Sequence, residues 1–150
     1  MKPLFTEKQR FNQWWLWLLL AVSLAVPAIL LFKEASEKSG GFSGLIIILS
    51  VIILFVVLRM TTVVTKENIQ LTYFPFVNKT INLADIETMK VINYGFVGGW
   101  GIRFWTQYGT VYNVRGNKGL HIKFKNGKQL VIGTQKPQEL EKVVEQLNSK

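Results

Sequence analysis

Two long runs of apolar residues dominate the first third of the chain. Residues 11–32 carry no charged side chain, and neither do residues 40–58. As helices rising about 1.5 Å per residue, the runs would be roughly 33 Å and 28 Å long, close to the roughly 30 Å hydrocarbon thickness of a bilayer. Neither run has the polar face that a helix in a water-soluble domain needs. The pattern therefore predicts a hairpin of two transmembrane helices joined by a short loop over residues 33–39.

The charges around these runs indicate an orientation. Basic residues concentrate on the cytoplasmic side of membrane helices, and they lie before the first run and after the second, whereas the loop between the runs balances two lysines with two glutamates. We therefore expect both termini in the cytoplasm. The first run is too long for a signal peptide and no small-x-small cleavage site follows it, so it is expected to remain as an anchor. The basic residues before the first run and just after the second are Lys2, Lys8, Arg10, Arg59 and Lys66.

After Arg59 the pattern changes to the two-residue period of half-buried strands. Residues 69–74 alternate in this way, and residues 120–125 repeat the alternation. Asn126-Gly127 is a strong hairpin signal, because both central positions of a type I′ turn need positive φ. With the further short runs between these segments, the sequence predicts about seven antiparallel strands.

The last residues of the chain have the period of a helix. Pro137 suits the first helical position, and the apolar residues that follow have the i, i+3, i+4, i+7 spacing of one helix face. Strands followed by a single helix define an α+β order. The apolar residues of this stripe are Leu140, Val143, Val144 and Leu147.

Composition narrows the chemistry. The chain has 150 residues, a formal net charge of +9, one histidine and no cysteine. The lack of cysteine excludes disulfides, thiolate catalysis, thiolate metal sites and lipidation on cysteine. No cofactor or metal site is predicted.

The basic residues are unevenly placed. No acidic residue occurs between residues 88 and 138, and alternation places His121, Lys123 and Lys125 on one strand face. Such a stripe suits anionic lipid headgroups, although a merely solvated face is an equally simple interpretation. Nucleic acid is not expected, because no recognised reading motif accompanies the charge. The basic residues of the stretch are Lys90, Arg103, Arg115, Lys118, Lys123, Lys125, Lys128 and Lys136.

Catalytic residues are sparse. His121 has no carboxylate or nucleophile near it in the sequence, and Asp85 and Glu87 are the only close pair of acids in the predicted domain (59–150) before its final helix. Acid–base catalysis needs such groups to converge, so the sequence favours a protein that is not an enzyme. An enzyme using Asp85, Glu87 and His121 stays open as an alternative.

A glycine-rich stretch spans residues 95–101. Phosphate-binding glycine loops lead into a helix, whereas strand-like sequence lies on both sides here. The glycines are therefore expected to form a long loop between strands. Phe96, Val97 and Trp100 alternate with them and would give this loop an apolar tip for a membrane or a partner.

The order of these segments resembles the bacterial pleckstrin-homology (PH)-like domains found in small membrane proteins. The resemblance covers about residues 59–148 and implies two orthogonal antiparallel sheets, a partly open barrel plugged by the helix. It implies no activity. The segments that carry it are residues 7–11, 69–76, 81–86, 99–103, 112–114 and 131–137, with Glu139-Leu140 inside the final helix.

Together these patterns predict a bacterial multi-pass membrane protein of α+β class, with a transmembrane helical hairpin followed by a PH-like antiparallel β-sandwich and a C-terminal α-helix. We expect a binding or scaffold module for a protein partner or anionic lipid headgroups. The alternatives are a homo-oligomer or a structural subunit of a larger membrane complex. The candidate binding residues are Arg103, Arg115, Lys118, Lys123, Lys125, Lys128 and Trp100. The predicted organisation is a cytoplasmic tail (1–10), helix 1 (11–32), a loop (33–39), helix 2 (40–58) and the PH-like domain (59–150).

Overall fold

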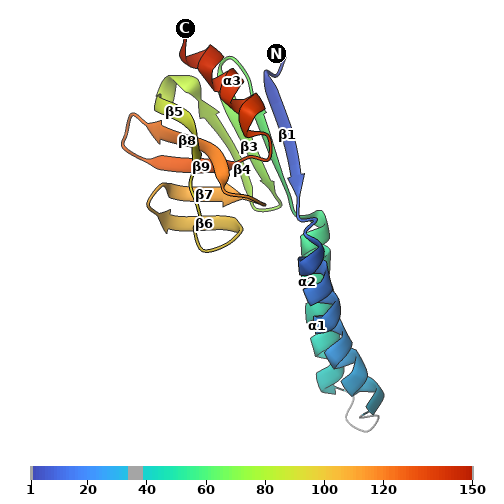
Figure 1. The fold of residues 1–150 in the computed structure, drawn as a ribbon. Coiled ribbons are helices and arrows are strands. Elements are labelled where there is room, and N and C mark those ends of the chain that lie inside the picture. Colours follow the sequence, from blue (N-terminus) through green and yellow to red (C-terminus); the bar gives the residue numbers. More distant parts are fainter. Residues whose placement is uncertain (1, 34–38, 150) are drawn as a thin grey trace. The chain divides into compact units, whose positions relative to one another are not determined.

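The computed structural model describes residues 2–33 and 39–149, without the side chains of residues 30–43 and 45. Contacts divide the chain into unit 1, residues 1–10 and 59–150, and unit 2, residues 11–58. The elements (Figure 1) are β1 (Phe5–Arg10), α1 (Trp14–Lys33), α2 (Ser39–Val57), β2 (Arg59–Val64), β3 (Asn68–Phe74), β4 (Val77–Asn82), the 3-10 turn η1 (Leu83–Asp85), β5 (Ile86–Asn93), β6 (Gly101–Thr106), β7 (Gly109–Asn113), β8 (Lys118–Phe124), β9 (Gln129–Gly133) and α3 (Pro137–Asn148).

The first sheet of unit 1 has the order β1-β2-β3-β4, and each neighbouring pair is antiparallel. Its strand β1 lies in the segment that was expected to be a polar tail, so that expectation is wrong. The reason is that Phe5, Glu7 and Gln9 all point inward and are buried, while the residues between them are exposed. Two of the three inward residues are polar, which conceals the strand pattern.

The second sheet has the order β5-β8-β9-β7-β6. The β8–β9 hairpin is confirmed at the expected position, and β6 and β7 form a second hairpin. However, β7 and β9 run parallel. The chain reverses direction before β8 and again after it, so β9 has the same direction as β7. The loop after β5 crosses the sheet to reach β6 at the opposite edge (Figure 1).

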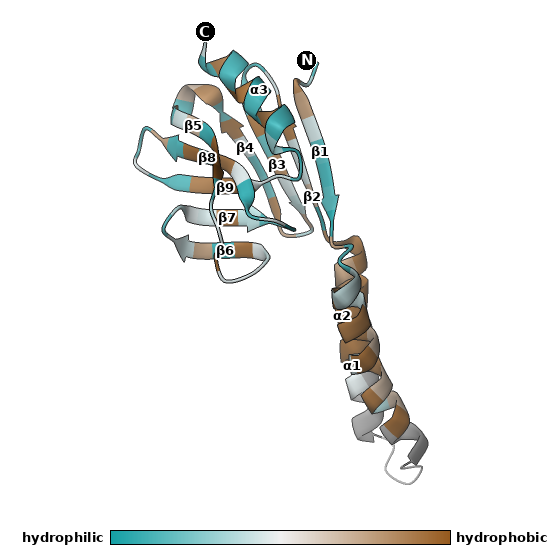
Figure 2. Cartoon of the chain, viewed as in Figure 1, coloured by the Kyte–Doolittle hydropathy of each residue, from teal (hydrophilic) through white to brown (hydrophobic). Residues whose placement is uncertain are grey.

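Helix α3 completes the core of unit 1. The predicted helix is confirmed, with Pro137 in its first turn and with Leu140 and Val144 buried. It packs against β5, β8 and β1, and Asn148 donates a hydrogen bond to the carbonyl of Met89 at 3.2 Å. Figure 2 shows the two-sided hydropathy of α3, which is the reason why one face of the helix is buried on the sheets.

Polar groups connect β1 to the segment between β9 and α3. The Glu7 carboxylate, with only 4% of the residue exposed, accepts hydrogen bonds from the Thr134 hydroxyl at 2.6 Å and the Gln135 amide at 2.8 Å. The Gln9 side chain donates to the carbonyl of Gly133 at 2.8 Å. Buried polar groups need such partners, so these bonds fix the first strand of the chain against the last.

Unit 2 contains α1 and α2, which contact each other. The rings of Phe11 and Phe55 meet edge to face, with centroids 5.6 Å apart. The hydroxyls of Ser23 and Ser50 donate to the backbone carbonyls one turn earlier, which satisfies them inside their own helices. The hydropathy of both helices is high along their described lengths (Figure 2).

The predicted transmembrane hairpin is wrong. Among the described residues, no helix has both the length and the hydropathy that a membrane crossing requires. The same finding contradicts three predictions that depend on the hairpin. These are the multi-pass architecture, the integral membrane localisation and the orientation with both termini in the cytoplasm.

The predicted fold class also needs correction. The described residues form two sheets of four and five strands with three helices, an α+β arrangement without a closed barrel. About seven antiparallel strands were expected, whereas the described residues form nine. One of the additional strands, β1, comes from the segment before the helices, and the β7–β9 pair is parallel. Neither feature follows from local periodicity, because both depend on pairing between distant segments.

Candidate functional site

The side of unit 1 away from α3 carries two outer strands. Helix α3 packs on β1 and β5, the first strands of the two sheet orders, and β4 and β6 are the strands at the other ends. A groove of about 420 Å³ involves both of these outer strands. Its lining residues are Lys79, Phe104, Trp105, Thr106, Gly109, Thr110, Phe124, Lys128, Gln129 and Leu130. We call this the edge groove.

Two neighbouring aromatic residues project from β6 beside the edge groove. Trp105 is 98% exposed and Phe104 is 61% exposed, and their ring centroids are 6.3 Å apart. Trp105 has a positive φ of 55°, and the β6–β7 register shifts between Arg103 and Thr106. A bulky residue in this conformation costs on the order of 1–3 kcal/mol. Unit 1 thus holds an indole in water at an energetic cost.

The turn after Trp105 maintains this conformation. The Thr106 hydroxyl donates to the carbonyl of Gly109 at 2.9 Å and accepts a hydrogen bond from the amide of Tyr108 at 3.1 Å. Side-chain hydrogen bonds of this kind replace ladder bonds in tight turns. The aromatic pair is therefore presented by a hydrogen-bonded turn on a sheet.

All charges among the residues that line the edge groove are positive. They are Lys79 from β4 and Lys128 from the β8–β9 turn, both exposed. The backbone amide of Lys128 donates a hydrogen bond to the Asn126 side chain at 3.0 Å. This bond fixes the turn and does not involve the ammonium group of Lys128. The floor is apolar, with Leu130 buried and Phe124 half-buried. The groove thus combines aromatic and aliphatic surface with two cations.

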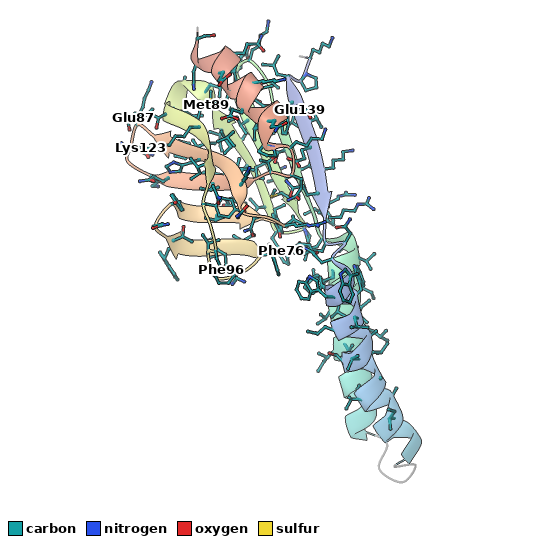
Figure 3. All side chains as sticks on the ribbon, viewed as in Figure 1. Phe76, Glu87, Met89, Phe96, Lys123 and Glu139 are labelled. Atoms are coloured by element: carbon teal, nitrogen blue, oxygen red, sulfur yellow. The ribbon has the colours of Figure 1, made fainter. Side chains whose placement is uncertain are left out.

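The structure distributes the predicted basic residues over several places. Lys123 forms an ion pair with Glu87 at 3.1 Å (Figure 3), because β5 and β8 are neighbours. Lys118 lines a second groove, of about 670 Å³ beside the start of α3, with Glu139 and Glu141. Lys125 follows β8, and its amide donates to the Asp85 carbonyl at 3.1 Å. Only Lys128 lies in the edge groove.

The remaining three predicted residues, Arg103, Trp100 and Arg115, lie in β6 and in the segments before β6 and after β7. The Arg103 side chain lies against Gly99 of the glycine-rich loop, and Trp100 lies in the same loop, immediately before β6. Arg115 is in the turn between β7 and β8, where its carbonyl accepts a hydrogen bond from Gln135 at 2.5 Å. The seven predicted residues therefore do not all line one groove.

Sequence reasoning missed Lys79, Phe104 and Trp105. Lys79 is far from the basic stretch in the sequence and reaches the groove only because β4 ends its sheet. Phe104-Trp105 was included in an expected strand without a role. The available signal was the pair itself, because two consecutive large aromatic residues in a strand must point to opposite faces unless the strand is bulged.

The glycine-rich loop is confirmed as a connection between strands. It covers a small apolar cluster of Tyr94, Val111 and Val131, against which Val97 packs. Phe96 is 86% exposed and lies at the tip of this loop, near β6 (Figure 3).

Asn113 positions the ends of this loop. Its amide donates to the Tyr94 hydroxyl at 3.2 Å, and its side-chain oxygen accepts from the Gly101 amide at 2.9 Å. The Tyr94 hydroxyl donates in turn to the carbonyl of Gly116 at 3.2 Å. Asn113 is buried, so the network is part of the structure of unit 1 and not of an open site.

Burial alters the acid strength of three tyrosines. Burial raises the pKa of Tyr73, and the positive charge of Arg103 lowers it by less. Burial likewise raises the pKa of Tyr94 against a smaller opposing effect of its hydrogen bond with Asn113, and burial raises the pKa of Tyr112. Each folded tyrosine thus keeps its proton at a pH where an unfolded one has lost it.

Unit 1 is therefore expected to lose stability in alkali. Below about pH 10, the ordinary tyrosine pKa, the contribution of the neutral hydroxyls is fully present. As the pH rises through the raised folded pKa values, the folded state binds more protons than the unfolded state, so the free energy of unfolding falls. Urea unfolding followed between pH 8 and pH 11.5 measures this. In Tyr94→Phe the free energy of unfolding should fall less steeply with pH, by at most the slope that one bound proton contributes. An unchanged slope would contradict the assignment.

The candidate catalytic residues, Asp85, Glu87 and His121, lie outside both grooves. His121 bonds through Nε2 to the Gln129 side chain at 2.8 Å and meets the Tyr108 ring edge to face at 5.5 Å. Glu87 pairs with Lys123, and Asp85 ends η1. Neither the two carboxylates nor the imidazole lines the edge groove or the groove beside α3. Within the described part of the chain, no three metal-ligating side chains come together either.

Comparison with known proteins gives no family for this chain. No protein-family model matches it, and no curated protein and no solved structure matches it either. The resemblance to bacterial PH-like domains is therefore wrong as an identification: it rested on short segments, and the sheet order with β1 and the parallel β7–β9 pair differs from the antiparallel arrangement that it implied.

Proposed function

We propose that this protein is a non-enzymatic binding module that engages a protein partner through the edge groove of unit 1. The observation that carries the proposal is the pair Phe104 and Trp105, exposed on an outer strand directly beside that groove. Large aromatic residues supply much of the binding energy at protein interfaces. An exposed tryptophan and phenylalanine side by side mark a contact surface more strongly than scattered apolar residues do.

The backbone at Trp105 supports the same proposal. Positive φ at a bulky residue persists only where the surroundings enforce it, and such positions concentrate at functional sites. Here the Thr106–Gly109 turn holds the indole outward. A tryptophan needed only for stability would gain more by turning its ring toward the apolar floor at Leu130.

The lining of the edge groove suits binding better than catalysis. It contains hydroxyl, amide, ammonium and aromatic groups but no carboxylate and no imidazole, which are the usual general acids and bases. Anionic lipid headgroups, the other partner expected from the basic stretch, receive less support. The lysines of that stretch lie in separate places, and Lys123 is already paired with Glu87.

Replacing both aromatic residues of β6 should abolish partner capture. The variant is Phe104→Ser with Trp105→Ser in the full chain, purified by an affinity tag from cells that naturally produce it. Because central aromatic residues each contribute about 2 kcal/mol or more, we expect recovery of a discrete partner to fall at least about tenfold. Quantitative mass spectrometry of the co-purified proteins measures this.

The matched control is Phe96→Ser, which removes another exposed aromatic side chain from unit 1 but not from the edge groove. This variant should recover the partner as the unmodified chain does. Equal recovery by all three proteins, or an equal loss in the control, would overturn the proposal. Hydrogen exchange of amides in β8 and β9 confirms that each variant is folded.

A further inference from the structure

The edge groove is selective in its charge and in its size. Building on the proposed function, we propose that the partner presents an extended acidic segment, which inserts an apolar side chain into the edge groove and places carboxylates on Lys79 and Lys128. The occupant follows from the residues of the groove, taken one property at a time.

The apolar part of the groove accepts side chains and not a folded surface. Its volume of about 420 Å³ lies at the lower end of the range of about 300–1,000 Å³ for ligand pockets. Leu130 and Phe124 form the floor and Phe104 one wall. One or two apolar side chains of an extended chain fill such a space, and their burial provides the main attraction.

The charge of the groove selects the residues beside that apolar side chain. Lys79 of β4 and Lys128 of the β8–β9 turn both line the groove, one from each sheet, and no lining residue is acidic. The ion pairs of the described residues use Lys123 and Lys136, not these two lysines. Complementary charges favour encounter and reject like-charged competitors, so an acidic segment is preferred over a basic one.

The outer strands themselves favour recognition through side chains. Lys79 lies on the same face of β4 as the buried Ile81, but it is itself exposed at the edge of the first sheet. The pairing of β6 is regular only over residues 101–103 before its register shifts. A lysine on an edge strand and a bulge are both devices that discourage an added strand. The specificity of the segment therefore comes from its side chains and not from extended backbone pairing.

Synthetic peptides test the chemistry of the segment directly. Fluorescence anisotropy of the full chain is measured with three labelled ten-residue probes: alternating Glu and Leu, alternating Lys and Leu, and alternating Glu and Ser. The Glu–Leu probe should bind, and the other two should bind at least about tenfold more weakly. Binding of the Glu–Leu probe should also weaken as the salt concentration rises.

Charge reversal in the groove should exchange the preference. In the variant Lys79→Glu with Lys128→Glu, affinity for the Glu–Leu probe should fall at least about tenfold, and the Lys–Leu probe should become the better ligand. The matched control, Lys66→Glu with Lys142→Glu, changes the net charge equally at two exposed positions outside the groove. It should retain the original preference.

Three outcomes would overturn the inference. The first is equal binding of the Glu–Leu and Lys–Leu probes, and the second is an equal loss in both double variants. The third is binding to vesicles with phosphatidylserine that depends on Lys79 and Lys128 while no peptide binds, which would assign the groove to lipid headgroups. If partner capture still depends on Phe104 and Trp105 in any of these cases, the proposed function stands without the acidic segment. If capture is independent of them, the proposed function itself fails.

Discussion

Replacing Glu7 by alanine should destabilise unit 1 by about 2–4 kcal/mol. The substitution removes the acceptors of the Thr134 hydroxyl and the Gln135 amide, and it leaves the hydroxyl of the buried Thr134 without its acceptor. Hydrogen bonds to charged groups contribute about 1.5–3 kcal/mol each, and an unsatisfied buried group carries a penalty of its own. Hydrogen exchange of amides in β8 and β9 reports the stability of unit 1 in the full chain.

The adjacent residue provides the control. Lys8 lies on the same strand but is exposed, and Lys8→Ala should change the stability by no more than about 0.5 kcal/mol. Glu7→Gln keeps one acceptor and should lie between the two. If Glu7→Ala were as mild as Lys8→Ala, β1 would not be anchored through its carboxylate.

Gly109→Ala, which adds a single methyl group, should also destabilise unit 1, by about 3 kcal/mol or more. Gly109 has a φ of 74°, and a Cβ there would overlap with the backbone carbonyl of Gln129. The overlap arises because β7 and β9 are parallel neighbours, so neither backbone can withdraw without breaking the sheet. Gly109→Ala therefore combines an unfavourable φ with a steric clash, measured by the same exchange experiment and by urea unfolding.

Gly127→Ala separates the two effects. Gly127 has a similar φ of 79°, but nothing lies within 4 Å of the position that a Cβ would occupy. This variant should lose only the conformational part, about 1–2 kcal/mol. Equal losses in the two variants would show that the close approach of β7 to β9 is absent in solution.

Local sequence patterns predicted the elements whose partners are near in the chain. The helix at Pro137–Asn148 and the β8–β9 hairpin are where the periodicity and the Asn126-Gly127 signal placed them. Both are determined by side chains a few residues apart. The strand β1 was missed, because its inward residues include the polar Glu7 and Gln9, whose partners are more than 120 residues away.

The apolar helices show the opposite failure. Their sequence pattern alone predicted a transmembrane hairpin, but the described helices do not satisfy the requirements for a crossing.

The candidate site was predicted only in part. Lys128 was expected from the basic stretch, but Lys79 joins it through the order of the first sheet, and Phe104 and Trp105 through the bulge in β6. The positive φ of Trp105 has no local sequence signal, because such conformations are enforced by the surrounding turn and not preferred by the residue. The composition of the chain indicated that the charge of the groove would be positive, but not which lysines line it.

The register of β1 determines the order in which the chain can fold. Arg10 and Arg59 are paired at the end of the β1–β2 ladder, so all of unit 2 is an insertion between two strands of one hairpin. During synthesis β1 emerges first and has no partner until β2 follows, and the partners of Glu7 come last, 127 and 128 residues later. Closing a long loop costs entropy that grows only with the logarithm of its length, and contacts between such distant segments slow folding. Unit 1 can therefore form all these contacts only after β9 and the segment that follows it have been made. A nascent chain that ends before β9 lacks the hydrogen-bond partners of Glu7 in β1.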